Sequence, residues 1–104
     1  MLSQSEILTT IKQQIHEEIP DAKVYLFGSR ATGNLNDESD WDILIKTSMN
    51  VNRALRKKIY YKLFPLTLRI LNTIDCTIVN EKDWQENPSY YVLKHSITNE
   101  AVQV

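Results

Sequence analysis

The chain has 104 residues, of which 42% are hydrophobic, and 12 basic against 13 acidic residues leave a formal net charge of −1. This size and composition predict a single domain over residues 1–104, with one modest core. They exclude a membrane-spanning run, and the near-neutral charge gives no case for non-specific nucleic-acid binding. The N-terminus lacks a signal-like pattern, and the single Cys76 cannot form an internal disulfide, which favours a cytoplasmic setting.

The first segment predicts an amphipathic helix. Ser3 is positioned to cap it, and Glu6, three residues later, completes a capping box. Apolar residues then recur at four-residue steps and mark the buried face of the helix: Ile7, Ile11, Ile15 and Ile19. Because a residue that precedes proline disfavours the helical conformation, we expect the helix to end near Pro20.

A short apolar strand over residues 24–27 leads into Gly28 and Ser29, and Arg30 and Ala31 are interpreted as the start of a helical turn. In such a setting, free backbone N–H groups point at an anion. Gly28 would allow close approach of a phosphate, Ser29 would add a hydroxyl donor and Arg30 a cation. An ordinary tight turn uses the same residues. The spacings of a Walker loop or a dinucleotide-binding fingerprint are absent.

Two acids, Asp40 and Asp42, begin the next predicted strand. Because side chains alternate along a strand, both acids lie on one face, while Trp41 faces the hydrophobic side. Adjacent acids repel one another, and a cation between them removes that cost. Mg²⁺ suits such a site because it takes carboxylate oxygens together with substrate phosphates. The alternative is a solvated strand face with two incidental acids.

Asn50 or Asn52 is placed to cap a second helix, which is predicted to run to about Phe64, with Pro65 marking a break or a second short turn. Residues 43–74 contain no acid, and their basic residues are Lys46, Arg53, Arg56, Lys57, Lys58, Lys62 and Arg69. We interpret them as a solvated helix face. Contact with an acidic partner, tRNA or a nucleoside triphosphate is the functional alternative.

A further strand over residues 71–79 carries a third acid, Asp75. If this strand lies beside the first pair, Asp75 completes a three-carboxylate cluster with Asp40 and Asp42, which could hold two metal ions. The alternative is a polar residue at an exposed strand start. Cys76, next to it, is interpreted as core packing.

The last part of the chain predicts a helical turn over residues 81–86 and a helix that restarts at Asn87 and Pro88 and runs to about Ile97. In chain order the predicted elements are helix, strand, strand, helix, strand and helix. This order predicts an α/β (α+β) sandwich with a small mixed β-sheet flanked by helices.

Taken together, Gly28-Ser29, Asp40-x-Asp42 and Asp75 resemble the DNA polymerase β-type nucleotidyltransferase superfamily. The fuller string G-S-R-A-x-G…S-D-x-D-I-L is most similar to its minimal nucleotidyltransferase (MNT) domains. The resemblance implies a polymerase β-like core in which Gly28 and Ser29 hold the phosphates of ATP or another nucleoside triphosphate. It also implies that Asp40 and Asp42 bind two Mg²⁺ ions, and that Asp75 binds one and helps to deprotonate the attacking hydroxyl.

MNT domains are commonly partnered with helical HEPN (higher eukaryotes and prokaryotes nucleotide-binding) proteins, as the antitoxin of a toxin–antitoxin pair. The resemblance therefore implies transfer of AMP from ATP to a tyrosine hydroxyl of such a partner. Few residues follow Asp75, so we expect the acceptor to come from another chain or to be small. Two alternatives are a non-catalytic antitoxin that acts by occlusion, and transfer to a small molecule such as an aminoglycoside, which the missing acceptor domain disfavours.

Overall fold

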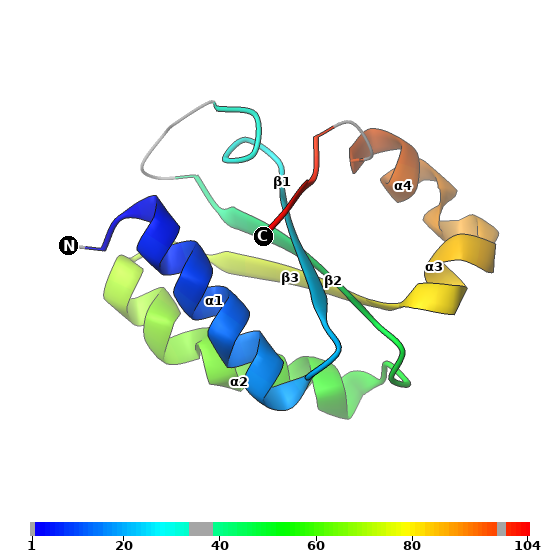
Figure 1. The fold of residues 1–104 in the computed structure, drawn as a ribbon, viewed down its shortest axis with the longest axis horizontal. Helices are drawn as coiled ribbons and strands as arrows, with labels where there is room; N and C mark the ends of the chain where they lie inside the picture. The colour runs from blue at the N-terminus through cyan, green and yellow to red at the C-terminus, as the bar shows by residue number, and fades with distance from the viewer. Residues whose placement is uncertain (1, 34–38, 98–99) are drawn as a thin grey trace.

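The computed structural model describes residues 2–33, 39–97 and 100–104, which form a four-stranded sheet between two helical layers (Figure 1). The strands are β1 (Lys23–Phe27), β2 (Trp41–Thr47), β3 (Ile74–Asn80) and β4 (Val102–Gln103), in the order β3-β2-β1-β4. β1 is antiparallel to β2 and β4, whereas β2 and β3 are parallel. The predicted mixed α/β architecture is confirmed.

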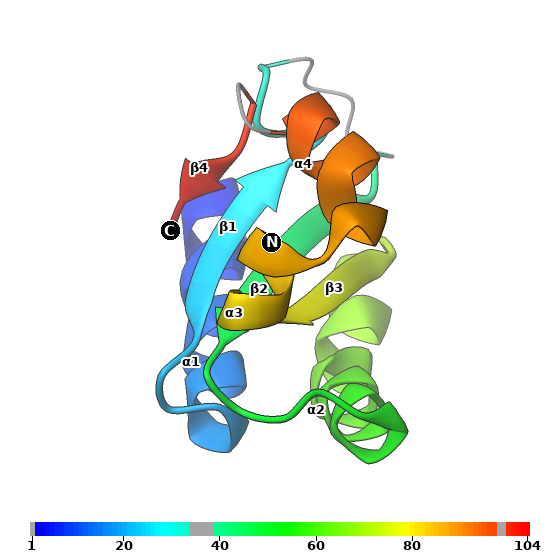
Figure 2. The same ribbon diagram turned by 90° about the vertical axis from the view of Figure 1, so that its right-hand side faces the viewer.

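The helical segments are α1 (Gln4–Glu18), α2 (Arg53–Ile70), α3 (Glu81–Glu86), the 3₁₀ turn η1 (Pro88–Tyr90) and α4 (Tyr91–Ile97). α1 and α2 cover one face of the sheet, and α3, η1 and α4 lie against the other (Figure 2). α2 connects the parallel strands β2 and β3, as a crossover helix does in a βαβ unit. In the described part of the chain, no helix combines the length and apolarity needed to cross a membrane.

Both predicted features of α1 are confirmed. The Ser3 hydroxyl accepts a hydrogen bond from the Glu6 amide at 3.1 Å, and the Glu6 carboxylate accepts one from the Ser3 amide at 3.4 Å. The isoleucine stripe is buried, and Ile19 caps the C-terminus with its amide bonded to the Ile15 carbonyl at 2.8 Å. Pro20 follows directly, as expected.

The predicted end of α2 near Phe64 is wrong. Asn52 caps the helix, but the helix continues through Pro65 to Ile70. Pro65 lies on the exposed side, where the carbonyl that its missing N–H leaves free can be hydrated. The buried stripe on the other side of α2, which includes Leu63 and Leu66, continues without interruption past the proline, and this burial outweighs the local break.

The main core lies between the sheet and the α1–α2 layer. Trp41, Ile43 and Ile45 point into it from β2, and Trp41 is fully buried, as predicted from the alternation of the strand. Cys76 packs against the same core, and burial raises the pKa of its thiol to about 12. This supports its interpretation as a packing residue.

β4 was not predicted. It is two residues long and both of its side chains are exposed, so it carries no alternation that a sequence pattern could reveal. It pairs with β1 in the register Tyr25↔Gln103, and the Val104 amide adds a hydrogen bond to the Val24 carbonyl at 2.9 Å.

The loop between α1 and β1 is fastened to the end of β2 by Asp21. Its Oδ1 accepts a hydrogen bond from the Thr47 hydroxyl at 2.6 Å, and its Oδ2 accepts bonds from the Ser48 amide at 2.7 Å and hydroxyl at 2.5 Å. These bonds favour the ionised form and lower the pKa of Asp21 to about 2, with the Ser48 hydroxyl making the largest contribution.

We expect Asp21→Asn to lower the free energy of unfolding by about 1 kcal/mol near neutral pH, because the amide group cannot accept all three bonds. The folded-state pKa lies below the ordinary value of 3.8, so this stabilisation is present above that value and is lost as the pH falls toward 2. Urea denaturation at a series of pH values would measure the difference from wild type, with the exposed Glu86→Gln as control. A difference that stayed constant down to pH 2 would contradict the assignment.

Candidate active site

Three strand ends meet at one edge of the sheet and bring the predicted acids together. There, β1 ends while β2 and β3 begin (Figure 1). Phe27 at the end of β1 is opposite Asp42 on β2, and Asp42 is opposite Asp75 on β3. Because side chains in register point to the same face, the two carboxylates are neighbours on the face opposite the main core.

The electrostatic environment of Asp42 reflects this neighbourhood. Its side chain is half-buried, whereas Asp40, one residue before β2, and Asp75 are exposed. Burial raises the pKa of Asp42 above its ordinary value, and the charges of Asp75 and Asp40 raise it further. The site therefore disfavours the negative charge of Asp42 unless a cation compensates it.

The closed three-carboxylate cluster that the sequence predicts is not formed in this structure. Within residues 2–33, 39–97 and 100–104, no three carboxylate, imidazole or thiol groups converge closely enough to hold a metal ion. The register joins Asp42 to Asp75, but Asp40 precedes the strand and its exposed side chain is not fixed by a ladder position. The donor set is nonetheless made of oxygens only, which is the chemistry that Mg²⁺ prefers.

Gly28 brings the turn after β1 directly over Asp42. Its φ is 74°, in the left-handed region, and a Cβ atom built on it would overlap Oδ2 of Asp42. Glycine therefore meets two demands at this position, a positive φ and a close approach to a carboxylate. This contact joins the predicted phosphate turn to the predicted metal ligand.

The helical turn predicted after Ser29 is wrong, because residues 28–33 form consecutive turns between two glycines with positive φ. The Ala31 amide donates to the Gly28 carbonyl at 3.1 Å, and the Thr32 hydroxyl donates to the Ser29 carbonyl at 3.1 Å. In the part of the chain that the structure describes, the amide and hydroxyl of Ser29 donate no hydrogen bond. Both donors can therefore serve an anion.

The side chain of Arg30 is buried and packs within the fold. Its side chain is only 7% exposed, its guanidinium carbon lies 4.1 Å from the centre of the Trp41 ring, and its Nε donates to the Ser39 carbonyl at 2.9 Å. It therefore holds the turn after β1 against the residues that lead into β2. The sequence carries no signal for this contact, although the unusual Trp41 between the two acids is the residue that makes it possible.

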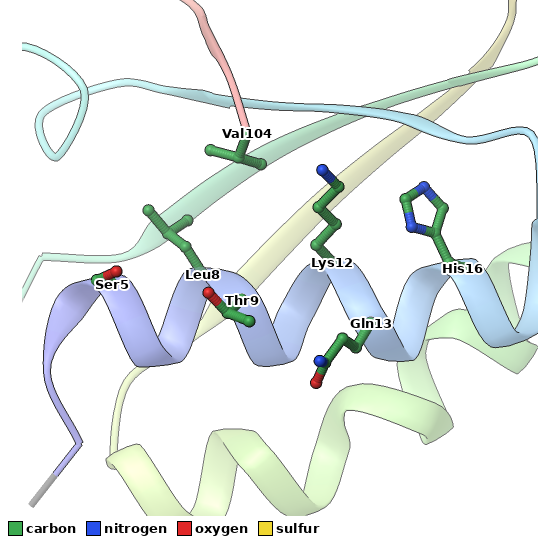
Figure 3. Close-up of a pocket in the computed structure, with 7 residues that line it drawn as sticks. All are labelled: Ser5, Leu8, Thr9, Lys12, Gln13, His16 and Val104. Atoms are coloured by element: carbon green, nitrogen blue, oxygen red, sulfur yellow. The ribbon is translucent and has the colours of Figure 1, made fainter.

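Two hollows of the described structure lie beside α1 and between α2 and β3. A hollow of about 600 Å³ beside α1 is lined by residues including Leu8, His16 and Val104, none of which was predicted to belong to the site (Figure 3). A second hollow of about 650 Å³, between α2 and β3, includes Asp75 in its lining. Of the two hollows, the second is the one whose lining includes a residue predicted to belong to the site.

A comparison of sequences finds an adenylyltransferase similar to part of this chain. Spectinomycin 9-adenylyltransferase of Staphylococcus aureus is 33% identical over a region that covers 62% of this chain and 28% of the relative. The chain thus spans less than a third of the length of this curated relative.

Among solved structures, a chain of the Shewanella oneidensis complex of a tri-AMPylated HEPN toxin with an MNT antitoxin superposes with a TM-score of 0.65. It is 20% identical, over 97% of this chain and 71% of that chain. A toxin–antitoxin complex with AMP-PNP gives a TM-score of 0.63 at 22% identity, over 91% of this chain and 69% of that chain. Likeness at this level of identity shows that the fold is shared.

The family model of the nucleotidyltransferase domain matches residues 8–100, which include all six residues predicted from the sequence to form the site. Because this match covers most of the chain, the chain belongs to the nucleotidyltransferase domain family.

Proposed function

We propose that this domain is a Mg²⁺-dependent nucleotidyltransferase that moves AMP from ATP to a hydroxyl of a partner protein, as the antitoxin of a HEPN/MNT pair. The observation that carries the proposal is the parallel register that sets Asp42 beside Asp75, beneath a glycine turn with free donors. Asp42, whose negative charge is disfavoured, lies beside a second acid and next to a turn with free donors, and this arrangement suits a metal–triphosphate complex.

In this proposal Asp40, Asp42 and Asp75 hold Mg²⁺, and Gly28 and Ser29 contact the β- and γ-phosphates. When bound, Mg²⁺ supplies charge neutralisation at the phosphates and at the attacking oxygen. The acceptor hydroxyl oxygen forms a bond to the α-phosphorus, the bond from that phosphorus to the bridging oxygen of the β-phosphate breaks, and pyrophosphate leaves. Asp75 accepts the hydroxyl proton. The protein contributes alignment and electrostatics rather than a covalent intermediate.

The contact of Arg30 with Ser39 and Trp41 supports a positioning role in the same reaction. It ties the turn that would hold the phosphates to the strand that carries Asp40 and Asp42. A direct contact of Arg30 with the nucleotide stays a prediction.

The choice of acceptor rests on the comparisons. Two of the similar solved structures are toxin–antitoxin complexes, one with a tri-AMPylated HEPN toxin and the other with AMP-PNP. A free, half-buried Cys76 agrees with the reducing cytoplasm, where ATP and Mg²⁺ are supplied. Transfer to a small molecule is the second candidate, because one curated relative is a spectinomycin adenylyltransferase.

We expect Asp40→Asn and Asp42→Asn each to lower the rate of transfer by about 100-fold or more, since each removes an anionic metal ligand from the transition state. The assay captures the tagged chain from its native cells, adds Mg²⁺ and one α-labelled nucleoside triphosphate at a time, and follows label on co-captured protein and in the small-molecule fraction. Asp83→Asn, on α3 and away from the carboxylate edge, is the matched control.

Label on a co-captured protein would support the proposal, and label only on a small molecule would support the second candidate. Transfer at the wild-type rate by both variants would contradict the metal assignment. A co-captured protein that stays unlabelled would favour antitoxin action by occlusion.

Removing the charge of Asp42 should also change stability, independently of catalysis. Without metal, Asp42→Asn should melt at a higher temperature than wild type, because it removes a half-buried charge and its repulsion with Asp75. Mg²⁺ should raise the melting temperature of wild type more than that of the variant, because only the wild type gains a compensated charge. Differential scanning fluorimetry with Mg²⁺ and with EDTA measures both effects, and equal shifts in the two proteins would count against Asp42 as a ligand.

A methyl group at Gly28 should impair the site more than the same group at Gly33. Both glycines have positive φ, so alanine is strained at each by about 1–2 kcal/mol. Only at Gly28 does the new Cβ meet an obstacle, because nothing lies within 4 Å of the corresponding position at Gly33. We expect Gly28→Ala to lose transfer and Gly33→Ala to retain it, measured on proteins whose folding is checked by circular dichroism. Equal losses of transfer would show that the contact with Asp42 is unimportant.

A further inference from the structure

The groove of about 650 Å³ between α2 and β3 has no role in the proposed chemistry apart from the presence of Asp75 in its lining. Its walls are otherwise mainly apolar. The aromatic side chains of Tyr60, Tyr61 and Phe64 line it from α2, and Ile74, Cys76 and Ile78 line it from β3. A groove that is open, apolar and adjacent to a polar site is typical of binding surfaces.

The aromatic wall is unusually exposed for side chains of this size. Tyr60 is 60% and Tyr61 67% exposed, and their rings meet edge to face with centroids 5.4 Å apart. Phe64 extends this row, with its ring centre 5.9 Å from that of Tyr60. Exposed, contiguous aromatic residues are the composition that marks protein interfaces.

The opposite wall is an edge strand. β3 is the outermost strand in the order β3-β2-β1-β4, so no strand of the described chain pairs with its outer side. The Thr73 carbonyl accepts a hydrogen bond from the Trp41 amide at 2.9 Å. This bond shows which residues of β3 direct their backbone groups toward β2. By the alternation of a parallel ladder, the backbone groups of Ile74, Cys76 and Ile78 point away from β2. Such an edge can accept an added strand.

The groove lining contains two cations, Arg56 and Lys57, and one acid, Asp75. α2 contains no acid, and its Lys58 and Lys62 form ion pairs with Glu18 and Glu17 of α1. Arg56 and Lys57, which line the groove, have no acidic partner among the described residues. One side of α2 is therefore neutralised within the fold, and the side that faces the groove is left positive.

We propose that this groove docks an extended, acidic segment of a partner protein, which pairs with the edge of β3 and places apolar side chains against Tyr60, Tyr61 and Phe64. A protein segment fits better than a single-stranded nucleic acid, because the lining is largely apolar and one wall is an unpaired strand edge. A strand added along β3 would pass alongside Asp75, which lines the groove and whose carboxylate belongs to the pair on the other face of the sheet. That this segment carries the acceptor hydroxyl rests on the proposed function, whereas the docking does not.

The test is a selection from a library of random 12-residue peptides on the full chain, without nucleotide, followed by fluorescence anisotropy with the enriched peptides. We expect enriched peptides to be acidic and to carry apolar or aromatic residues at alternate positions. Their affinity should fall at least tenfold for Arg56→Glu/Lys57→Glu and stay within twofold for Arg53→Glu/Arg69→Glu, which makes the same charge change on α2 outside the groove lining. Two N-methylated peptides are compared, one methylated at the odd-numbered amides and one at the even-numbered amides. Only one of the two should lose binding, because in an added strand only every second amide donates to the sheet edge.

The absence of enriched peptides, equal losses in the two double variants, or tighter binding of a twelve-nucleotide oligouridine than of any peptide would overturn the proposal. Circular dichroism of both variants excludes unfolding as the cause of a loss. Asp40→Asn separates this inference from the proposed function. If the Asp40→Asn chain still binds the peptides, docking holds whether or not the wild-type chain transfers nucleotide. If the wild-type chain transfers labelled nucleotide to a tyrosine of a bound peptide, both proposals hold.

Discussion

In a parallel pair of strands the register decides which side chains are neighbours, and the register of β2 against β3 makes neighbours of Asp42 and Asp75. This pairing is unfavourable for the isolated domain, because like charges on adjacent strands repel one another. It is imposed by the packing of the opposite face, where Trp41, Ile43 and Ile45 are fully buried in the main core. A shift by one residue would expose this apolar set, so the core fixes the acids in place.

The turn between β1 and β2 accommodates the fixed position of Asp42. Gly28 leaves room for the Asp42 carboxylate, and the stacking of Arg30 on Trp41 anchors the turn to the strand that carries the acids. The buried and the exposed faces of β2 thus serve different purposes at consecutive residues. Trp41 supports the turn through the core side, while Asp42 presents its charge on the other side.

Features that depend on local chemistry were predictable from the sequence. The capping box at Ser3, the isoleucine stripe of α1 and the burial of Trp41 follow from spacing alone, and the structure has them. Asp42 and Asp75 are adjacent only because β2 and β3 pair, and the spacing of residues in the sequence does not reveal which strands pair. The continuation of α2 past Pro65 does not follow from local propensity, because the burial of its apolar stripe outweighs the break. The stacking of Arg30 and the pairing of β4 are tertiary contacts without any periodic signature.

The pairing of β1 with β4 has a consequence for biosynthesis. Tyr25 pairs with Gln103, so nearly the whole described chain separates the two partners. β1 leaves the ribosome early and pairs with β2 on one side, but its other edge has no partner until residues 102–103 are available. During that interval the nascent sheet exposes an unpaired edge on each side, and each edge can pair with another chain.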